Sequence, residues 1–199
     1  MYIVCLDLEG VLIPEIWINF SQFTGIEELR LTTRDIPDYN VLMKKRLGIL
    51  KDHNLKLTDI QNVIGKMEPL PGALEFMNRL REKTQVIILS DTFAQFAGPM
   101  MKKLAWPTLF CNELVIDKDD NVIDFRLRQQ DGKRKAVEGF HSMGFQVLAA
   151  GDSYNDLSMI RKADAGVLFC PPENIVKENP DLPVAVDYGQ LMAEIEKVL

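Results

Sequence analysis

Short apolar runs recur along the chain and alternate with segments in which apolar residues have helical spacing. The clear runs are YIVCL (residues 2–6), QVIIL (85–89), QVLAA (146–150) and AGVLF (165–169), and PVAV (183–186) is a weaker one. Helical spacing occurs at residues 72–83, 93–104, 133–144, 155–163 and 188–199. Buried strands that alternate with helices are typical of βαβ units. The pattern predicts an α/β fold with a Rossmann-like, mainly parallel sheet flanked by helices.

Two segments depart from this alternation. Residues 15–67 contain no convincing strand and show three helical patterns, at residues 15–25, 39–53 and 57–67. Residues 108–128 alternate apolar and polar positions around the polar turn KDDN, which indicates a β-hairpin. We therefore expect two domains, a core of residues 1–14 plus 69–199 and a helical insert of residues 15–68.

One of the helical patterns contains a helix-breaking signal. Gly98 and Pro99 lie in the middle of the amphipathic segment 93–104. Proline lacks the backbone N–H that an α-helix uses, and its ring clashes with the preceding turn. We expect a kink or an interruption at this point.

Composition narrows the class of protein. The 199 residues are 47% hydrophobic and 26% charged, which is typical of a globular protein with one ordinary core. The net charge of −6 disfavours nucleic acid as a partner, and no apolar stretch approaches the roughly 18 residues of a membrane span. Three cysteines and the lack of a signal-peptide pattern favour the cytoplasm. Two distant histidines argue against a zinc site or a His-dependent triad.

The residues that follow the predicted strands are rich in acids and hydroxyls. Asp7 and Glu9 follow the first strand, and the next two strands are followed by Ser90-Asp91-Thr92 and by GDSYND (151–156). In an open α/β sheet, ligands bind beyond the carboxyl ends of the strands. Each stretch taken alone also suits a turn or a helix N-cap. Their convergence at one edge of the sheet favours a binding site.

Three aspartates of these stretches, Asp7, Asp152 and Asp156, should form a concentrated negative site. Such carboxylates repel one another unless a cation lies among them. Because all the ligands are oxygens, Mg²⁺ is the expected cofactor. Magnesium at this edge of a sheet suggests phosphate chemistry.

A phosphoryl group at this edge needs hydrogen-bond donors and positive charge. Ser90 and the backbone N–H groups near residues 9–10 and 91–92 are candidate donors. Lys133, Arg134 or Lys135 is a candidate cation. Basic residues at a helix N-terminus are unfavourable because they oppose the macrodipole, and this cost suggests that one of them has a function. The alternative is a solvated basic cluster.

Four motifs in this order resemble those of the haloacid dehalogenase-like (HAD) phosphatase superfamily over nearly the whole chain. The first, D-x-D-x-[TV], stands here as Asp7-Leu8-Glu9-Gly10-Val11, and the second, a Ser or Thr after an apolar strand, is Ser90. The third is a Lys, matched best by Lys133 in DGKRKAV, and the fourth, G-D-x-x-x-D, is GDSYND. Glu9 departs from the family pattern, which has Asp at that position.

The helical insert resembles the cap of phosphoserine phosphatases. Glu15 matches the acid that binds the substrate amine, Arg46 in LMKKRLGIL matches the residue that binds the substrate carboxylate, and Tyr39 falls at an aromatic position of that pocket. The stretches CLDLEGVL (5–12), TTRDIPDY (32–39), IILSDTF (87–93) and AAGDSYND (149–156) resemble most the bacterial bifunctional phosphoserine phosphatase / phosphoserine:homoserine phosphotransferases. The resemblance implies O-phosphoserine as substrate and homoserine as a further phosphoryl acceptor, and it leaves the oligomeric state open.

The resemblance also implies roles for individual residues. Asp7 is the nucleophile that becomes an aspartyl-phosphate, Glu9 transfers the proton, and Ser90 and Lys133 hold the transferring group. The implied Mg²⁺ site consists of Asp7, the Glu9 backbone carbonyl, Asp152 and Asp156, the last orienting the water shell or Lys133. The implied substrate-binding residues are Glu15, Tyr39, Arg46, Ser90, Asp91, Thr92 and Asn155.

Two other functions compete with this one. The first is a HAD phosphatase for another small phosphomonoester, such as a nucleotide or a cofactor-salvage substrate. A stacking aromatic pair in the pocket would favour a nucleotide, whereas Glu15 together with Arg46 favours a zwitterion. The second is a receiver-like signalling domain, which also has an Asp at a strand end and binds Mg²⁺. The helical insert, Ser90 and GDSYND argue against a receiver.

Overall fold

The computed structural model describes residues 1–33, 35–36 and 38–199, so Arg34 and Pro37 of the TTRDIPDY stretch lie outside the described residues. Seven strands form one sheet in the order β4-β3-β2-β1-β5-β6-β7. Every neighbouring pair is parallel except β3 with β4, which form the predicted hairpin. The strands are β1 (Tyr2–Leu6), β2 (Gln85–Phe93), β3 (Thr108–Ile116), β4 (Val122–Arg126), β5 (Gln146–Gly151), β6 (Ala165–Phe169) and β7 (Val184–Ala185).

Helices cover both faces of the sheet because the central strands are apolar on both faces. In β1, Val4 and Leu6 belong to one apolar cluster and Ile3 and Cys5 to another, and successive side chains of a strand point to opposite faces. The first cluster includes residues of α4 (Ala73–Arg81), α5 (Ala94–Lys103) and α9 (Tyr188–Glu196). The second includes residues of α6 (Gly132–Ser142), α7 (Leu157–Lys162) and α8 (Glu173–Glu178). The predicted fold class is confirmed.

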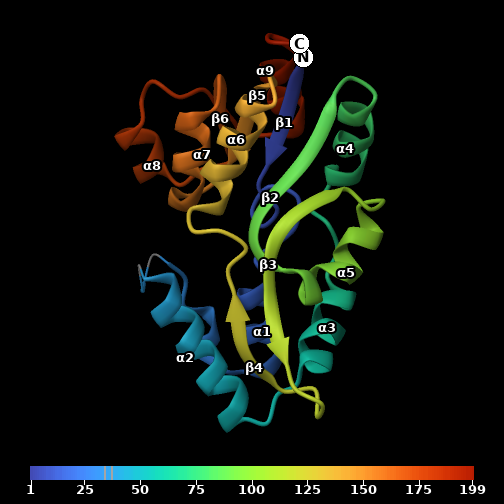
Figure 1. The fold of residues 1–199 in the computed structure, drawn as a ribbon, viewed down its shortest axis with the longest axis vertical. Coiled ribbons are helices and arrows are strands. Elements are labelled where there is room, and N and C mark those ends of the chain that lie inside the picture. Colours follow the sequence, from blue (N-terminus) through green and yellow to red (C-terminus); the bar gives the residue numbers. More distant parts are fainter. Residues whose placement is uncertain (34, 37) are drawn as a thin grey trace.

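The segment between β1 and α4 is helical, as predicted. It contains α1 (Ile16–Thr24), the 3₁₀-helix η1 (Glu27–Arg30), α2 (Tyr39–Asp52) and α3 (Leu57–Lys66). These helices lie beyond the carboxyl end of β1, and the β3–β4 hairpin reaches between α2 and α3 (Figure 1). We call residues 15–68 the cap; its status as a separate domain stays a prediction. Within the described residues, no helix is both long and apolar enough to span a bilayer.

The hairpin tip holds the N-terminus of α3. One carboxylate oxygen of Asp120 accepts hydrogen bonds from the backbone N–H of Thr58 at 2.9 Å and from its hydroxyl at 2.6 Å. The Asp120 carbonyl accepts another from the N–H of Leu57 at 3.1 Å. The first N–H groups of a helix have no partner within the helix, so a residue of the core caps a helix of the insert.

The second strand is longer than its apolar run predicts. It continues to Phe93, so Ser90, Asp91 and Thr92 lie within β2 and not in a loop after it. Pairing with β3 is regular up to Leu89, and after a register shift it resumes where Phe93 faces Asn112. The prediction of a loop was wrong because the apolar pattern ends at Leu89 while the extended backbone continues.

The expected interruption of α5 is also absent, since the helix runs unbroken through Pro99. A proline at position 99 leaves the carbonyl of Gln95 without its usual helical donor. Gln61 of α3 supplies a substitute, because its Nε2 donates to the Gln95 carbonyl at 2.8 Å. The helix therefore tolerates Pro99 because a cap residue replaces the lost hydrogen bond.

Replacing Gln61 by Leu should lower the free energy of unfolding by about 1–2 kcal/mol, because a partly buried carbonyl then lacks its donor. Urea denaturation measures this change. In a Pro99→Ala background the same replacement should cost clearly less, because alanine restores the backbone N–H. Equal losses in both backgrounds would contradict this explanation of the unbroken helix.

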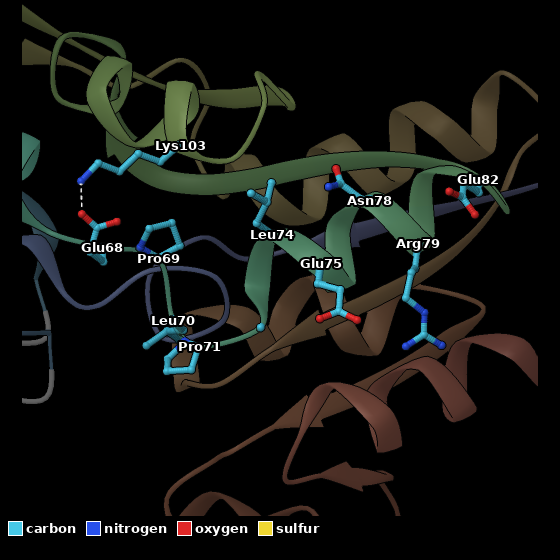
Figure 2. Close-up of a pocket in the computed structure, with 11 residues that line it drawn as sticks. Glu68, Pro69, Leu70, Pro71, Leu74, Glu75, Asn78, Arg79, Glu82 and Lys103 are labelled. Atoms are coloured by element: carbon cyan, nitrogen blue, oxygen red, sulfur yellow. Dashed lines mark hydrogen bonds and ion pairs between the residues drawn. The ribbon is translucent and has the colours of Figure 1, made fainter.

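Lys103, at the end of α5, binds the segment through which the chain returns from α3 to α4. Its Nζ donates to the carbonyls of Gly65 at 3.1 Å and of Met67. It also forms an ion pair of 2.7 Å with Glu68, which Figure 2 shows. A cation near the last carbonyls of a helix is favourable. The contacts of Lys103 and Gln61 thus join the cap helix α3 to the core helix α5 at two points.

Candidate active site

Asp7 lies at the carboxyl edge of the sheet, directly after β1. Its backbone N–H donates to the carbonyl of Ala150 in β5 at 3.0 Å, which extends the ladder by one residue. Its side chain is buried, and Oδ1 accepts a hydrogen bond from Lys133 Nζ at 2.8 Å. The backbone of the predicted nucleophile is thus held by β5, and its side chain is held by Lys133 of α6.

Lys133 joins Asp7 to a second carboxylate. Its Nζ lies 2.6 Å from Asp156 Oδ1, and the lysine is only 4% exposed. Arg134 and Lys135 instead form ion pairs with a glutamate of their own helix. Of the three basic residues considered from the sequence, Lys133 is the one that enters the site.

Asp156 organises the GDSYND loop. Its Oδ2 accepts hydrogen bonds from the N–H groups of Asp152 and Ser153, both at 3.0 Å, and from the Ser153 hydroxyl at 3.1 Å. A side chain at Gly151 would lie 2.3 Å from the Asp156 carboxyl carbon, so the loop can close only around glycine. The buried carboxylate thus fixes the loop that carries Asp152.

The acids of the site outnumber its lysine. Burial raises the pKa of Asp7 well above its usual range, and the charges of Asp156 and Asp152 add to this, although Lys133 opposes it. Burial lowers the pKa of Lys133, but the surrounding carboxylates outweigh burial and raise that pKa well above its usual range. Lys133 therefore stays a cation, and the site favours a further positive charge.

The donor set fits Mg²⁺. One oxygen from each of Asp7, Asp152 and Asp156 lies within 4.8 Å of the others. Gly10 has a φ of +82°, and a Cβ there would lie 2.5 Å from the Asp152 carboxyl carbon, so the backbone approaches this cluster closely. Oxygen donors are those that Mg²⁺ prefers. Both oxygens of Asp156 accept hydrogen bonds, Oδ1 from Lys133 and Oδ2 from the GDSYND loop.

Glu9 turns from Asp7 toward the cap. Its Oε2 accepts a hydrogen bond from the backbone N–H of Ile16, the first residue of α1, at 2.8 Å. Burial and the nearby Glu15 raise the pKa of Glu9 to about 8, against the opposing effects of Ile16 and Arg46. A carboxyl group with such a pKa keeps its proton near neutral pH, which is the form that a general acid needs.

Arg46 is a buried cation that lines the same pocket. Its Nη2 donates to the carbonyl of Leu31 at 2.8 Å and its Nη1 lies 3.7 Å from Met43 Sδ. Its Nε has no hydrogen-bond partner among the described residues. No carboxylate in the described part of the chain forms an ion pair with it. Burial lowers the pKa of Arg46 to about 10, so the guanidinium stays charged at neutral pH. Glu9 and Glu15 raise the pKa of Arg46 from a greater distance. A buried charge with no ion-pair partner among the described residues suits an anion-binding role.

The backbone of Asp91 is a junction between cap and core. Its carbonyl accepts hydrogen bonds from the Tyr39 hydroxyl at 2.9 Å and from Asn112 Nδ2 at 3.2 Å. Its carboxylate accepts one from Asn155 Nδ2 at 3.3 Å and lies 3.9 Å from Lys133 Nζ. Tyr39 thereby ties α2 to the strand that carries Ser90.

Ser90 and Thr92 are buried hydroxyl residues on this strand. The N–H of Thr92 donates to Ser90 Oγ at 3.1 Å, while Thr92 Oγ1 is buried and has no hydrogen-bond partner in the part of the chain that the structure describes. Both residues line the pocket beside Lys133. They are placed to donate to a phosphoryl oxygen, although their roles stay predictions.

Sequence reasoning missed two residues of the site. Asn112 is a buried polar residue within the alternating pattern of β3, and that irregularity was its only signal. Trp17 of α1 is buried in the cap, and it also lines the pocket, where the Arg46 guanidinium lies over its ring. The local sequence does not distinguish a tryptophan in the core of the cap from one that also lines the pocket.

A single pocket of about 1170 Å³ brings the predicted site residues together. All of them line it except Asp156, which lies behind Lys133. A smaller hollow of about 740 Å³ is bordered by Glu75 and Arg79 of α4 and by the segment that Lys103 binds (Figure 2). None of the predicted site residues lines that hollow.

Comparison with known proteins agrees with this geometry. A family model described as haloacid dehalogenase-like hydrolase matches residues 3–164. A phosphoserine phosphatase of Pseudomonas syringae pv. tomato is 55% identical over 195 residues, which cover 98% of this chain and 82% of that protein. The phosphoserine phosphatase ThrH of Pseudomonas aeruginosa is 55% identical over 197 residues, which cover 99% of this chain and 96% of that protein.

Solved structures have the same fold. A substrate-bound phosphoserine phosphatase complex superposes with a TM-score of 0.77 at 21% identity, covering 96% of each chain. A phospho-aspartyl intermediate analogue of phosphoserine phosphatase superposes with a TM-score of 0.73 at 22% identity, covering 92% of each chain. The family match, the two relatives and the shared fold lead to one conclusion: this chain belongs to the haloacid dehalogenase-like hydrolase family.

Proposed function

We propose that the protein is a Mg²⁺-dependent phosphatase that hydrolyses O-phosphoserine through an aspartyl-phosphate on Asp7. The observation that carries the proposal is one pocket lined by two different sets of groups. The first set is Asp7, Lys133 and the acidic cluster, and the second is Glu15 and Arg46. A phosphate suits the first set, and an ammonium and a carboxylate suit the second. The names of the two Pseudomonas relatives support the same substrate.

The first step forms a covalent intermediate. An oxygen of Asp7 attacks phosphorus, and the bond between phosphorus and the serine oxygen breaks. Lys133 and Ser90 hold the phosphoryl oxygens, and Glu9 gives its proton to the leaving oxygen, so serine departs neutral at that atom. Mg²⁺ bound by Asp7, Asp152 and the Glu9 carbonyl would neutralise charge on the phosphoryl oxygens.

The second step regenerates Asp7. Water attacks phosphorus, Glu9 accepts the proton that the water loses, and inorganic phosphate leaves. We propose that homoserine can replace water, in which case Glu9 takes the proton of its hydroxyl and O-phosphohomoserine forms. The hydrogen bond from Tyr39 to the Asp91 carbonyl holds the cap next to the reacting groups, where exclusion of bulk water would favour transfer over hydrolysis.

The structure supports a zwitterionic substrate over a nucleotide. One face of the Trp17 ring is covered by Arg46, and the ring of Tyr39 packs edge-on against Phe125. These rings therefore do not form an open pair between which a base could stack.

A phosphate-release assay over a panel of phosphomonoesters tests the proposal. With Mg²⁺, phosphoserine should be hydrolysed at least about ten times more efficiently than phosphoethanolamine or a nucleoside monophosphate, because these lack a group for Arg46 or Glu15. EDTA should abolish turnover, and Mg²⁺ should restore it. Turnover of a nucleotide in preference to phosphoserine would contradict the substrate assignment.

Replacing Glu9 by Asp should change the ratio of transfer to hydrolysis. Aspartate is shorter by about one C–C bond, ~1.5 Å, so its carboxyl cannot both reach Ile16 and keep its place relative to the leaving oxygen. We expect the ratio of phosphohomoserine to inorganic phosphate to fall in the variant when homoserine is present. Identical ratios in variant and wild type would show that the length of Glu9 does not select the acceptor.

A further inference from the structure

The orientation of Arg46 depends on an aromatic ring. The guanidinium carbon lies 4.4 Å from the centroid of the Trp17 ring. Its only hydrogen bond to oxygen among the described residues goes to the Leu31 carbonyl. An arginine side chain has many rotamers and needs contacts along its length to hold one of them. The face of Trp17, the Leu31 carbonyl and Met43 Sδ supply the contacts to the Arg46 guanidinium.

Trp17 is itself held in place from two sides. It packs edge-on against Phe20 of its own helix, with centroids 6.2 Å apart, and against Phe96 of α5, with centroids 5.6 Å apart. Its exposed fraction is 7%. Aromatic pairs favour edge-to-face arrangements of this kind over a face-to-face sandwich. The two contacts therefore favour this orientation of the ring.

The contact with Phe96 links this support to the strand that carries Ser90. Phe96 belongs to α5, which begins directly after β2, the strand of Ser90. Phe96 also packs against Phe93, the last residue of that strand, with centroids 5.5 Å apart. A chain of three rings thus runs from the strand of Ser90 to Arg46. It connects the strand of Ser90 to the support of Arg46 through packed side chains.

We infer that Trp17 is a positioning residue that sets Arg46 at the distance from Asp7 that a substrate carrying both a phosphate and a carboxylate requires. The inference rests on the proposed function, since it assumes that Arg46 binds the substrate carboxylate. It gives Trp17 a role in specificity that its place in the cap core does not imply. Replacing Trp17 should hardly change the affinity for a substrate that has no carboxylate.

The test compares two ligands that differ in the carboxylate. The KM for phosphoserine is measured in the wild type and in Trp17→Leu, and phosphoethanolamine is measured in both as a competitive inhibitor. We expect KM for phosphoserine to rise about tenfold in the variant, the effect of losing a buried cation–π contact, with kcat changing less than KM. The inhibition constant of phosphoethanolamine should rise less than threefold.

Matched variants separate positioning from packing. Trp17→Phe keeps an aromatic face and should recover most of the wild-type KM. Phe20→Leu removes one of the two rings that hold Trp17, so it should raise KM for phosphoserine, but less than Trp17→Leu does. In an Arg46→Met background, Trp17→Leu should raise KM no further, because residues that act through one group are not additive.

The possible outcomes divide cleanly. A parallel rise of both constants in Trp17→Leu, or effects of Trp17 and Arg46 that multiply, would overturn the inference and leave Trp17 a packing residue. An unchanged KM in Trp17→Leu would overturn it as well. Wild-type protein that fails to turn over phosphoserine would instead refute the proposed function, and the inference with it. Thermal unfolding of each variant confirms that the folded protein is being compared.

Discussion

Asp7→Asn should lower the rate of phosphate release by at least about 10⁴-fold, a loss typical of removing a nucleophile. The amide nitrogen and oxygen of asparagine cannot attack phosphorus to form a stable acyl-phosphate, and the residue loses one charge of the proposed Mg²⁺ site. The fold should persist. The charges of Asp156 and Asp152 disfavour the ionised form of Asp7, so a neutral side chain at this position removes a repulsion between carboxylates.

An exposed aspartate provides the matched control for this variant. Asp124 of β4 lies outside the pocket, so Asp124→Asn should retain wild-type turnover. Phosphate release by both variants is followed under saturating phosphoserine and Mg²⁺. Asp7→Asn that keeps more than a hundredth of the wild-type rate would mean that another group attacks phosphorus.

Lys133→Met should destabilise the protein by about 3–5 kcal/mol in the absence of Mg²⁺, because it leaves buried carboxylates without their partner. The lysine contacts Asp7 at 2.8 Å and Asp156 at 2.6 Å, and Asp156 is fully buried. Phosphate release should fall as well, since the same ammonium is proposed to hold the phosphoryl group.

Metal should partly rescue this stability. A cation that binds the unpaired acids of the folded state, and not the unfolded chain, adds free energy of unfolding by mass action. Urea denaturation with and without Mg²⁺ measures the difference, with Lys135→Met as a surface control in the same helix. A loss below about 1 kcal/mol, or a loss unaffected by Mg²⁺, would contradict the description of the buried cluster.

The position of the acidic cluster could be predicted from the sequence because it follows from strand order alone. Asp7 and Asp152 each follow an apolar run, and parallel strands end at the same edge of a sheet. Adjacent pairing of β1 with β5 then brings the two loops together. No side-chain detail is needed for this step, which explains why it succeeded.

The contacts between cap and core could not be predicted in the same way. Continuity of α5 at Pro99 depends on Gln61, which is 38 positions away in the chain, and the support of Arg46 depends on Trp17. Both contacts require the cap helices to be placed on the core. A local pattern reports which face of a helix is apolar, and not which residue lies opposite it.

The end of β2 was predicted wrongly for a related reason. Ser90, Asp91 and Thr92 break the apolar pattern, yet they stay in the strand because Phe93 pairs again with β3. Asn112 then bonds to the Asp91 carbonyl from that neighbouring strand. The extended backbone at the site is thus held by pairing partners that are distant in sequence.

Trapping the covalent intermediate tests the central claim most directly. Protein is mixed with phosphoserine labelled in its phosphate and with Mg²⁺, quenched rapidly in acid and digested, and the labelled peptide is identified by mass spectrometry. The account predicts label on Asp7 during turnover and none in Asp7→Asn. Label on any other residue, or wild-type turnover with no labelled protein at any time point, would contradict it.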